Sequence, residues 1–400
     1  MRARVLLAGL VAGSAWACAI PLYKHGIDDC PVTTMAAGDR VTVQFLGVGG
    51  FLISHGSDVV LTAPLYSNPS LVEYLLDHEI RTDGALVDRL LPPAAKSAKA
   101  IIVGHSHYDH LLDAPYVAIN KTSGAKIYGS ETTKNLLDSI AAKLAAAGSG
   151  VVSMDKDAHV PGVQKGEWVP IPGTHVWLMA VQSEHSDQVV AKVPLGPTIP
   201  LHLGRGKVTE PAKKVPRTPS QWAEGTVFSY VIDFRDASDT QTLFRVYYQD
   251  SGTNEPVGFL PEHVKNDGKA VDLAILCVGG AFDRLDTHPA GILLDTRPRF
   301  ALLAHWEDFF VPQPSYCVND RSTDEDDRGI PGIPGASAKF LGRWRKSDTE
   351  RFVDLVDQAI LRNHLPTRAW LPCPTWSRFE LPLSGDAQQP TAGLARGCPR

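Results

Sequence analysis

Four side chains that could bind a metal ion lie close together in the segment Gly104-His105-Ser106-His107-Tyr108-Asp109-His110. The segment directly follows the apolar run 100–103. Three histidines and an aspartate at this spacing cannot share one face of a helix, so we expect a tight loop at the end of a strand. Imidazole nitrogens and carboxylate oxygens are the ligands that zinc, iron and manganese prefer. The spacing therefore indicates a site for one or two cations.

Three later segments share one arrangement, in which an apolar run ends in a residue that could bind a metal. These residues are His185, Asp250 and His305. Side chains that follow strands at one edge of a sheet are where active sites collect in layered folds. Any one of the three alone is more often an ordinary surface or hydrogen-bonded residue. We include them because the four groups at 105–110 need partners to complete two coordination shells.

The elements that must position these residues are mostly strands. Residues 40–54 alternate apolar and polar side chains around a glycine turn, which predicts a β-hairpin. Helical periodicity is clearest at Thr133–Ala147 and after the capping box Ser347-Asp-Thr-Glu350. A further helix is expected to start near Asp113 and Pro115. Other strand-like runs lie at 59–61, 100–103, 176–181, 227–232, 243–248, 273–278 and 300–304. This mixture predicts an α/β fold with a two-layered β core and helices outside.

In type and order, these motifs resemble the metallo-β-lactamase superfamily of hydrolases. The resemblance runs from about residue 40 to about residue 310 and covers HSHYDH at 105–110, His185, Asp250-Ser-Gly and His305. It is closest to the branch of ascorbate-6-phosphate lactonase and N-acylphosphatidylethanolamine phospholipase D. Members of that branch also carry HYDHL after a GxGGFLI opening, which is Gly47–Ile53 in this chain.

The resemblance implies an αββα sandwich with the metals at one edge of the two sheets. It assigns His105, His107 and His185 to one metal. It assigns Asp109, His110 and His305 to a second metal, with Asp250 bridging the two. The cofactor it implies is a pair of zinc ions, and iron or manganese could occupy the same ligands.

Two departures from the family pattern bear on this assignment. Family members usually have Asp-Pro after the second hairpin strand, whereas this chain has Ala63-Pro64. That carboxylate normally supports the metal loop, and losing such a support typically costs ten- to a hundred-fold in metal affinity or activity. In addition, Leu111-Leu112-Asp113 is one residue longer than expected, so the family role of that aspartate is not transferred to Asp113.

The function expected from these residues is metal-dependent hydrolysis. A hydroxide that bridges the two metals would attack an ester, lactone, amide or phosphodiester, with Asp109 and Asp250 as the catalytic carboxylates. No GxSxG motif suggests a serine nucleophile. Two alternatives remain open: a di-iron or mono-iron redox enzyme on the same fold, and a metal-binding protein without turnover, to which Ala63 points.

Three aromatic residues are candidates for substrate binding. Trp306 and Phe309 follow the last ligand closely and could form an apolar wall, while Tyr108 could donate a hydrogen bond from within the metal motif. Packing into the core is an equally good interpretation of all three. The expected substrate is a small or lipid-like molecule. The net charge of −5 and the lack of a long basic cluster argue against nucleic acid.

The first residues predict export. A basic start precedes a short apolar run, and Ala15-Trp16-Ala17 fits the site that signal peptidase cleaves. We therefore expect a signal peptide at 1–17, with a periplasmic, extracellular or lipid-anchored mature protein. Cys18 follows the expected cleavage site, so a lipid on its thiol is the only membrane attachment that the sequence suggests.

The expected organisation continues with a linker at 18–38, a catalytic domain at 39–365 and a Pro-rich tail at 366–400. Two segments without periodicity, 188–225 and 311–342, are expected to be inserted loops such as lids or binding loops. Cys277 lies in an apolar run and is expected to be a core residue. Cys30, Cys317, Cys373 and Cys398 lie in loop-like stretches, where disulfides are expected in an oxidising compartment.

Overall fold

The computed structural model describes residues 40–397 except 71–72, 75, 187–189, 193–197, 201–203, 279–281, 307–337, 373–377 and 384–394. Several predictions lie outside these described residues. They are the signal peptide, the linker, the lipid on Cys18, the role of Phe309, and the disulfides of Cys30, Cys317, Cys373 and Cys398.

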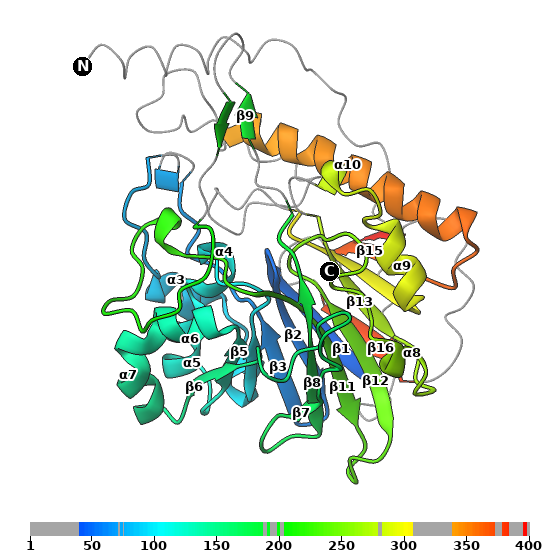
Figure 1. The fold of residues 1–400 in the computed structure, drawn as a ribbon, viewed down its shortest axis with the longest axis horizontal. Coiled ribbons are helices and arrows are strands. Elements are labelled where there is room, and N and C mark those ends of the chain that lie inside the picture. The colour runs from blue at the N-terminus through cyan, green and yellow to red at the C-terminus, as the bar shows by residue number, and fades with distance from the viewer. Residues whose placement is uncertain are drawn as a thin grey trace.

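Two mixed β-sheets face each other and form the centre of the fold (Figure 1). The first sheet has the strand order β16-β1-β2-β3-β4-β5-β6, and the second has the order β17-β15-β14-β13-β12-β11-β8-β7. The first sheet comprises β1 Arg40–Gly47, β2 Gly50–His55, β3 Asp58–Thr62, β4 Ala100–Ile102, β5 Lys126–Gly129, β6 Gly150–Ser153 and β16 Arg378–Pro382. The second comprises β7 Val169–Pro170, β8 Val176–Ser183, β11 Val227–Arg235, β12 Thr242–Tyr248, β13 Leu273–Cys277, β14 Phe300–Ala304, β15 Arg368–Pro372 and β17 Ala395–Gly397.

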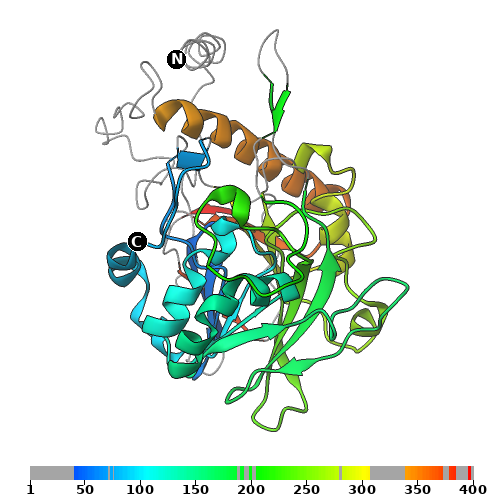
Figure 2. The same cartoon turned by 60° about the vertical axis from the view of Figure 1, so that its left-hand side comes forward.

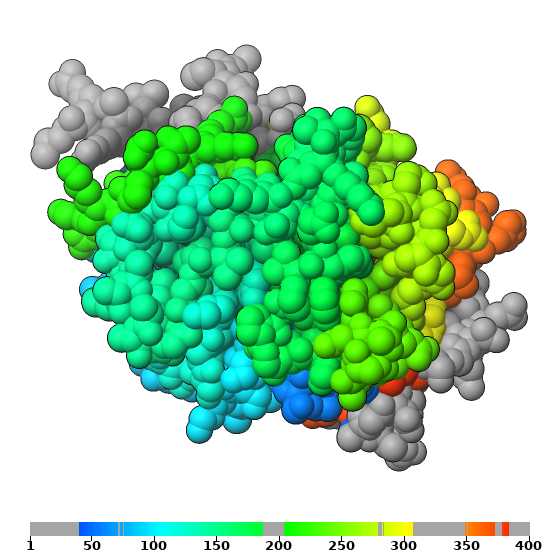
Figure 3. Space-filling model, turned by 60° about the horizontal axis from the view of Figure 1, so that its bottom comes forward, coloured from blue at the N-terminus to red at the C-terminus, as the bar shows by residue number. Residues whose placement is uncertain are grey.

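Helices cover the outer faces of both sheets (Figures 1 and 2). On the first sheet lie α3 Gly84–Leu90, η2 Pro93–Ser97, α4 Tyr108–Leu111, α5 Ala114–Asn120, α6 Glu131–Leu137, η3 Asp138–Ile140 and α7 Ala141–Ala146. η4 Pro219–Gln221 also lies on the side of the first sheet, where the adjacent Trp222 enters the same core. With the second sheet lie α8 Glu262–Lys265, η5 Phe282–Arg284, α9 Ala290–Thr296 and α10 Ala338–Arg362. A separate hairpin pairs β9 Val190–Lys192 with β10 Thr198–Pro200. Viewed from the lower end, the two halves of the chain pack side by side (Figure 3).

Alternation along β1 and β2 explains how the first sheet is sandwiched. Phe45, Phe51 and Ile53 enter the core between the two sheets, whereas Leu46 and Leu52 enter the core beneath the helices. All five are at most 2% exposed. A period-2 pattern with apolar residues on both faces is what a strand buried on both sides requires. The αββα sandwich expected from the sequence is therefore confirmed.

The structure differs from the sequence-based expectation in three elements. The helix expected at Thr133–Ala147 is broken into α6, η3 and α7, although the helical region does end before Gly148. The capping box at Ser347 lies inside α10, which begins nine residues earlier at Ala338, because the preceding residues also favour a helix. The stretch expected to be a tail contributes β15 and β16, whose partners are β14 and β1. Those pairings join residues far apart in the sequence, so no local pattern predicts them.

Cys277 is buried in β13, as expected for a core residue. None of the helices in the described part of the chain combines the length and the apolar character that a membrane crossing needs.

A buried ion pair ties together the second sheet far from the expected site. Arg245 donates to both carboxylate oxygens of Asp233, at 2.7 and 2.8 Å, and to Asp267 at 2.7 Å. Arg245 is 2% exposed and Asp233 is fully buried. Each charge therefore depends on the other for its stability in the interior.

We expect Arg245→Met to lower the free energy of unfolding by about 3–5 kcal/mol, because Asp233 then keeps a buried charge without its partner. Urea unfolding followed by circular dichroism measures the change. Arg217→Met is the control, since it removes an exposed ion pair with Glu79 and should cost less than about 1 kcal/mol. Equal losses in the two variants would contradict the role assigned to Arg245.

Candidate metal centre

Seven residues that could bind metal ions converge at one edge of the sandwich. The first four follow β4 and run into α4, and the others follow the ends of β8, β12 and β14. The expected loop at 105–110 thus continues into a helical turn, with His107 at its N-cap position. The set is His105, His107, Asp109, His110, His185, Asp250 and His305, and it forms three overlapping groups of potential ligands. The structure therefore brings together every ligand that the sequence predicted.

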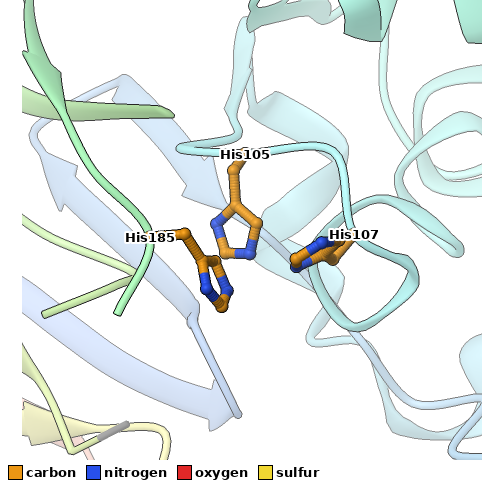
Figure 4. Close-up of side chains that lie close together, drawn as sticks. All are labelled: His105, His107 and His185. Carbon is orange, nitrogen blue, oxygen red and sulfur yellow. The ribbon is translucent and has the colours of Figure 1, made fainter. Parts of the chain in front are cut away.

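The first group is a triad of His105, His107 and His185, whose imidazole rings converge on a common point (Figure 4). Each pair of ring centroids is 4.7 Å apart. His105 and His107 come from the metal loop, whereas His185 comes from the segment after β8. We call this set the first triad.

The second group, which we call the second triad, contains Asp109, His110 and His305. Asp109 Oδ2 lies 3.3 Å from His110 Nε2 and 3.1 Å from His305 Nε2. These three atoms surround one point with an oxygen and two nitrogens, a donor set that suits zinc, iron or manganese.

Asp250 lies between the two triads. Its Oδ1 accepts a hydrogen bond from His105 Nδ1 at 2.9 Å, and its Oδ2 accepts one from Gly104 N at 2.8 Å. Oδ2 is also 3.4 Å from His110 Nδ1. One carboxylate thus contacts a histidine of each triad.

Hydrogen bonds leave one nitrogen of each ring in the first triad available for a metal. His105 donates from Nδ1 to Asp250, His107 donates from Nε2 to the Gly204 carbonyl at 3.0 Å, and His185 donates from Nδ1 to the Ser186 carbonyl at 2.6 Å. Within the described residues, the buried atoms His105 Nε2 and His107 Nδ1 have no hydrogen-bond partner. Buried polar atoms without a partner are costly, and a bound cation would satisfy them. The residues present therefore fit a metal centre.

Burial and neighbouring charges set the protonation of the ligands. Burial lowers the pKa of His107 well below its usual value, and burial together with His105 lowers the pKa of His185 to about 3. Both rings are consequently neutral, as metal ligation requires. Burial alone would raise the pKa of Asp109, but the charges and hydrogen bonds of His110 and His305 hold it well below its usual value.

Asp250 and His110 shift each other's pKa in opposite directions. Burial would raise the pKa of Asp250, yet the charges of His110 and His105 keep it below its usual value. Burial would lower the pKa of His110, but the charges of Asp109 and Asp250 outweigh it and raise that pKa. The two carboxylates are thus ionised, and His110 must release a tightly held proton before it can bind a metal.

The glycines of the two motifs make room for these side chains. A Cβ atom on Gly49 would lie 2.9 Å from both His110 Nδ1 and Tyr248 Oη, and a Cβ on Gly104 would overlap the Asp250 carboxylate. The Gly47–Ile53 opening therefore belongs to the site, because its turn packs directly beneath the second triad.

The backbone at His305 is held in an uncommon conformation. His305 has φ 59°, and the residue that accepts its N–H, Val48, has φ 51°. The hydrogen bond from His305 N to the Val48 carbonyl is 2.8 Å long. Left-handed conformations of residues other than glycine cost of order 1–3 kcal/mol and collect at functional sites. The strain points to a geometric requirement on this ligand.

The aromatic candidates are packed in the two cores. Tyr108 is fully buried and its ring lies 6.0 Å from that of Tyr74. Trp306 is 3% exposed and stacks on Phe45 at 6.4 Å. Both side chains therefore pack in the cores. Their role in substrate binding stays a prediction.

Position 63 offers no carboxylate to the metal loop, and Asp113 holds the loop after β3. Ala63 is fully buried, and its N–H donates to the Ile102 carbonyl at 2.9 Å. Asp113 Oδ2 accepts hydrogen bonds from Tyr66 N at 2.7 Å and from Ser67 N at 2.8 Å. Burial raises the pKa of Asp113. This aspartate therefore anchors the neighbouring loop and is not one of the metal ligands.

Two supports of the metal loop had no signal in the sequence. Ser106 contacts Thr133 in α6 through their hydroxyl groups, 2.7 Å apart. The Gly204 carbonyl accepts from His107, although it lies 97 residues away in the chain. Threonines and glycines occur throughout the sequence, so only the folded chain identifies these two.

The sheet order and the two triads together define an αββα sandwich with the architecture of the metallo-β-lactamase fold and a candidate metal centre at one edge. No family model matches the chain. The chain is 26% identical over 208 residues to a UPF0173 metal-dependent hydrolase of Polynucleobacter asymbioticus. That match covers 52% of this chain and 57% of the relative, so the chain spans little more than half the length of this curated protein.

Three solved structures are also similar. YhfI of Bacillus subtilis, a metallo-β-lactamase fold protein, is 13% identical with a TM-score of 0.41 and covers 86% of this chain and 100% of its own. CmlA of Streptomyces venezuelae, a diiron β-hydroxylase, is 12% identical with a TM-score of 0.42, covering 86% and 54%. Igni18 of Ignicoccus hospitalis, a metallo hydrolase, is 14% identical with a TM-score of 0.37, covering 68% and 85%.

We expect Gly104→Ala to weaken metal binding about 10- to 100-fold, because the new methyl group displaces the Asp250 carboxylate that orients His105. Competition with a chromogenic chelator measures the affinity. Lys143→Ala is the control, since this exposed side chain in α7 lies outside all the ligand groups. Unchanged affinity in the Gly104 variant would show that the position of Asp250 does not matter.

Proposed function

We propose that this chain is a metal-dependent hydrolase of the metallo-β-lactamase type that holds two divalent cations, one in each triad. The observation that carries the proposal is the pair of adjacent triads joined by the Asp250 carboxylate. The similarity to a protein described as a metal-dependent hydrolase supports the same class. We propose zinc as the natural metal, because imidazole and carboxylate ligands suit it.

Bound cations would supply a lowered pKa of bound water and stabilisation of negative charge that develops on the substrate. The chain's own residues provide the geometry for this chemistry. Asp109 holds His110 and His305 through Oδ2, while its buried Oδ1 has no hydrogen-bond partner among the described residues. Oδ1 is thus available to accept a hydrogen bond from a water molecule in the site and so to orient it. Asp250 contacts a histidine of each triad and so fixes the position of one triad relative to the other.

The proposed substrates carry a carbonyl or phosphoryl centre: esters, lactones, amides or phosphodiesters of small or lipid-like molecules. The resemblance of the metal and GxGGFLI motifs to those of ascorbate-6-phosphate lactonase and N-acylphosphatidylethanolamine phospholipase D favours the lactone and phosphodiester classes. We further propose that the protein acts after export, on the basis of the basic and apolar start of the chain.

We expect elemental analysis of the purified full chain to find about two zinc ions, and about one in each of His107→Ala and His305→Ala, since each variant loses one triad. Hydrolysis of a panel of phosphodiesters, lactones and acyl amides should fall to background in both variants. Chelation should abolish the activity of the parent, and added zinc should restore it.

His78→Ala is the control, because this exposed histidine lies outside all the ligand groups and its loss should change neither metal content nor activity. Stoichiometric iron in place of zinc would move a redox function ahead of hydrolysis. Two bound metals without hydrolysis of any substrate in the panel would favour a metal-binding protein without turnover. Absence of metal from the parent would refute the site itself.

A further inference from the structure

The segment Gly204–Gly225, which we call the strap, packs against the metal loop. His107 Nε2 donates to the Gly204 carbonyl at 3.0 Å, and Ser106 N donates to the Glu224 carbonyl at 2.8 Å. His107 and Ser106 are both fully buried. The strap therefore supplies two main-chain acceptors to the loop that carries four of the seven candidate ligands.

The residue at position 204 must be glycine for the strap to reach His107. A Cβ atom there would lie 2.6 Å from the carbonyl oxygens of Ser220 and Trp222, which belong to the far arm of the strap. Glu224 N also donates to the Gly204 carbonyl at 2.9 Å, so this oxygen is held from the strap side while it accepts from His107. Since the crowding atoms belong to the backbone, a side chain at 204 forces the two arms apart.

Other contacts fix the strap to elements on either side of the site. Val208 N donates to Thr132 Oγ1 at 3.0 Å, and the Val208 carbonyl accepts from Asn135 Nδ2 at 2.8 Å, which ties the strap to α6. On the other side Asp77 accepts from Ser220 N at 2.9 Å. Hydrogen bonds on both sides thus hold the strap in place, and its position at His107 depends on these contacts far from the site.

We propose that the strap is a positioning element for the first triad, in which the Gly204 carbonyl keeps the His107 proton on Nε2 and turns the Nδ1 lone pair toward His105 and His185. A hydrogen bond to the outer nitrogen of a ligating histidine fixes its tautomer and ring orientation and raises its basicity. The hydrogen bonds from the metal loop to the strap come from His107 of the first triad and from its neighbour Ser106. The inference rests on the proposed metal centre and gives the strap control over one of its two sites.

The test compares Gly204→Ala with Arg205→Ala, which changes an exposed neighbour in the same strap. Zinc titrations of the full chain at limiting free metal should show one site weakened about 10- to 100-fold in Gly204→Ala. The second triad should retain its parent affinity. Arg205→Ala should bind both ions as the parent does. Equal weakening of both sites in Gly204→Ala, or of neither, would overturn the proposal.

Thr132→Val provides a second, remote variant that leaves position 204 unchanged, because it keeps the side-chain shape and replaces the acceptor for Val208 N with a methyl group. We expect it to weaken the same single site, by less than Gly204→Ala does. If Gly204→Ala does not fold by circular dichroism, the outcome for Thr132→Val decides, and a parent-like first site in this variant would overturn the proposal.

Nuclear magnetic resonance of the metal-free protein separates this inference from the proposed function. The ring N–H proton of His107 should be protected from exchange with solvent in the parent and in Arg205→Ala, and exposed in Gly204→Ala. An unprotected proton in the parent would refute the positioning role of the strap, even if two metals bind. If the parent binds no metal but this proton is protected, the contact with Gly204 stands and the proposed hydrolase function is refuted.

Discussion

The placement of Asp250 between the two triads is the interaction on which the rest of the site depends. Histidine and carboxylate groups that are buried together would be costly as isolated charges, because burial disfavours ionised forms. Here the charges compensate one another: the histidines lower the pKa of Asp250 and Asp109, and the two carboxylates raise that of His110. The cluster can therefore be buried at the sheet edge while its remaining lone pairs stay available to a metal.

The sandwich makes this convergence possible because each ligand follows a strand that is locked in one of two sheets. Residues after β4 come from the first sheet, and those after β8, β12 and β14 come from the second. Glycines at 49 and 104 let the side chains of the opposite sheet approach the backbone. The left-handed conformation of His305 is tied to Val48 across the two sheets. Rigid elements hold ligands more precisely than free loops could.

Support for the metal loop comes from an unexpected part of the chain. With alanine at position 63, no carboxylate is available from the loop after β3, and Asp113 is occupied with the main chain of Tyr66 and Ser67. Backbone carbonyls of the strap and the hydroxyl of Thr133 instead contact the loop. Main-chain acceptors carry no charge, so they orient His107 and Ser106 without adding to the negative charge of Asp109 and Asp250.

The sequence by itself determined the candidate ligands and the layers of the fold, because both follow from local patterns. The spacing at 105–110, the strand-ending His185, Asp250 and His305, and the alternation of β1 and β2 depend on neighbouring residues alone. Only the tertiary structure decided the roles of Gly204, Thr133 and Asp113, the pairing of β15 and β16, and the burial of Tyr108 and Trp306. A carbonyl acceptor 97 residues from its donor, or the pairing of β16 with β1, depends on long-range contacts that no local pattern encodes.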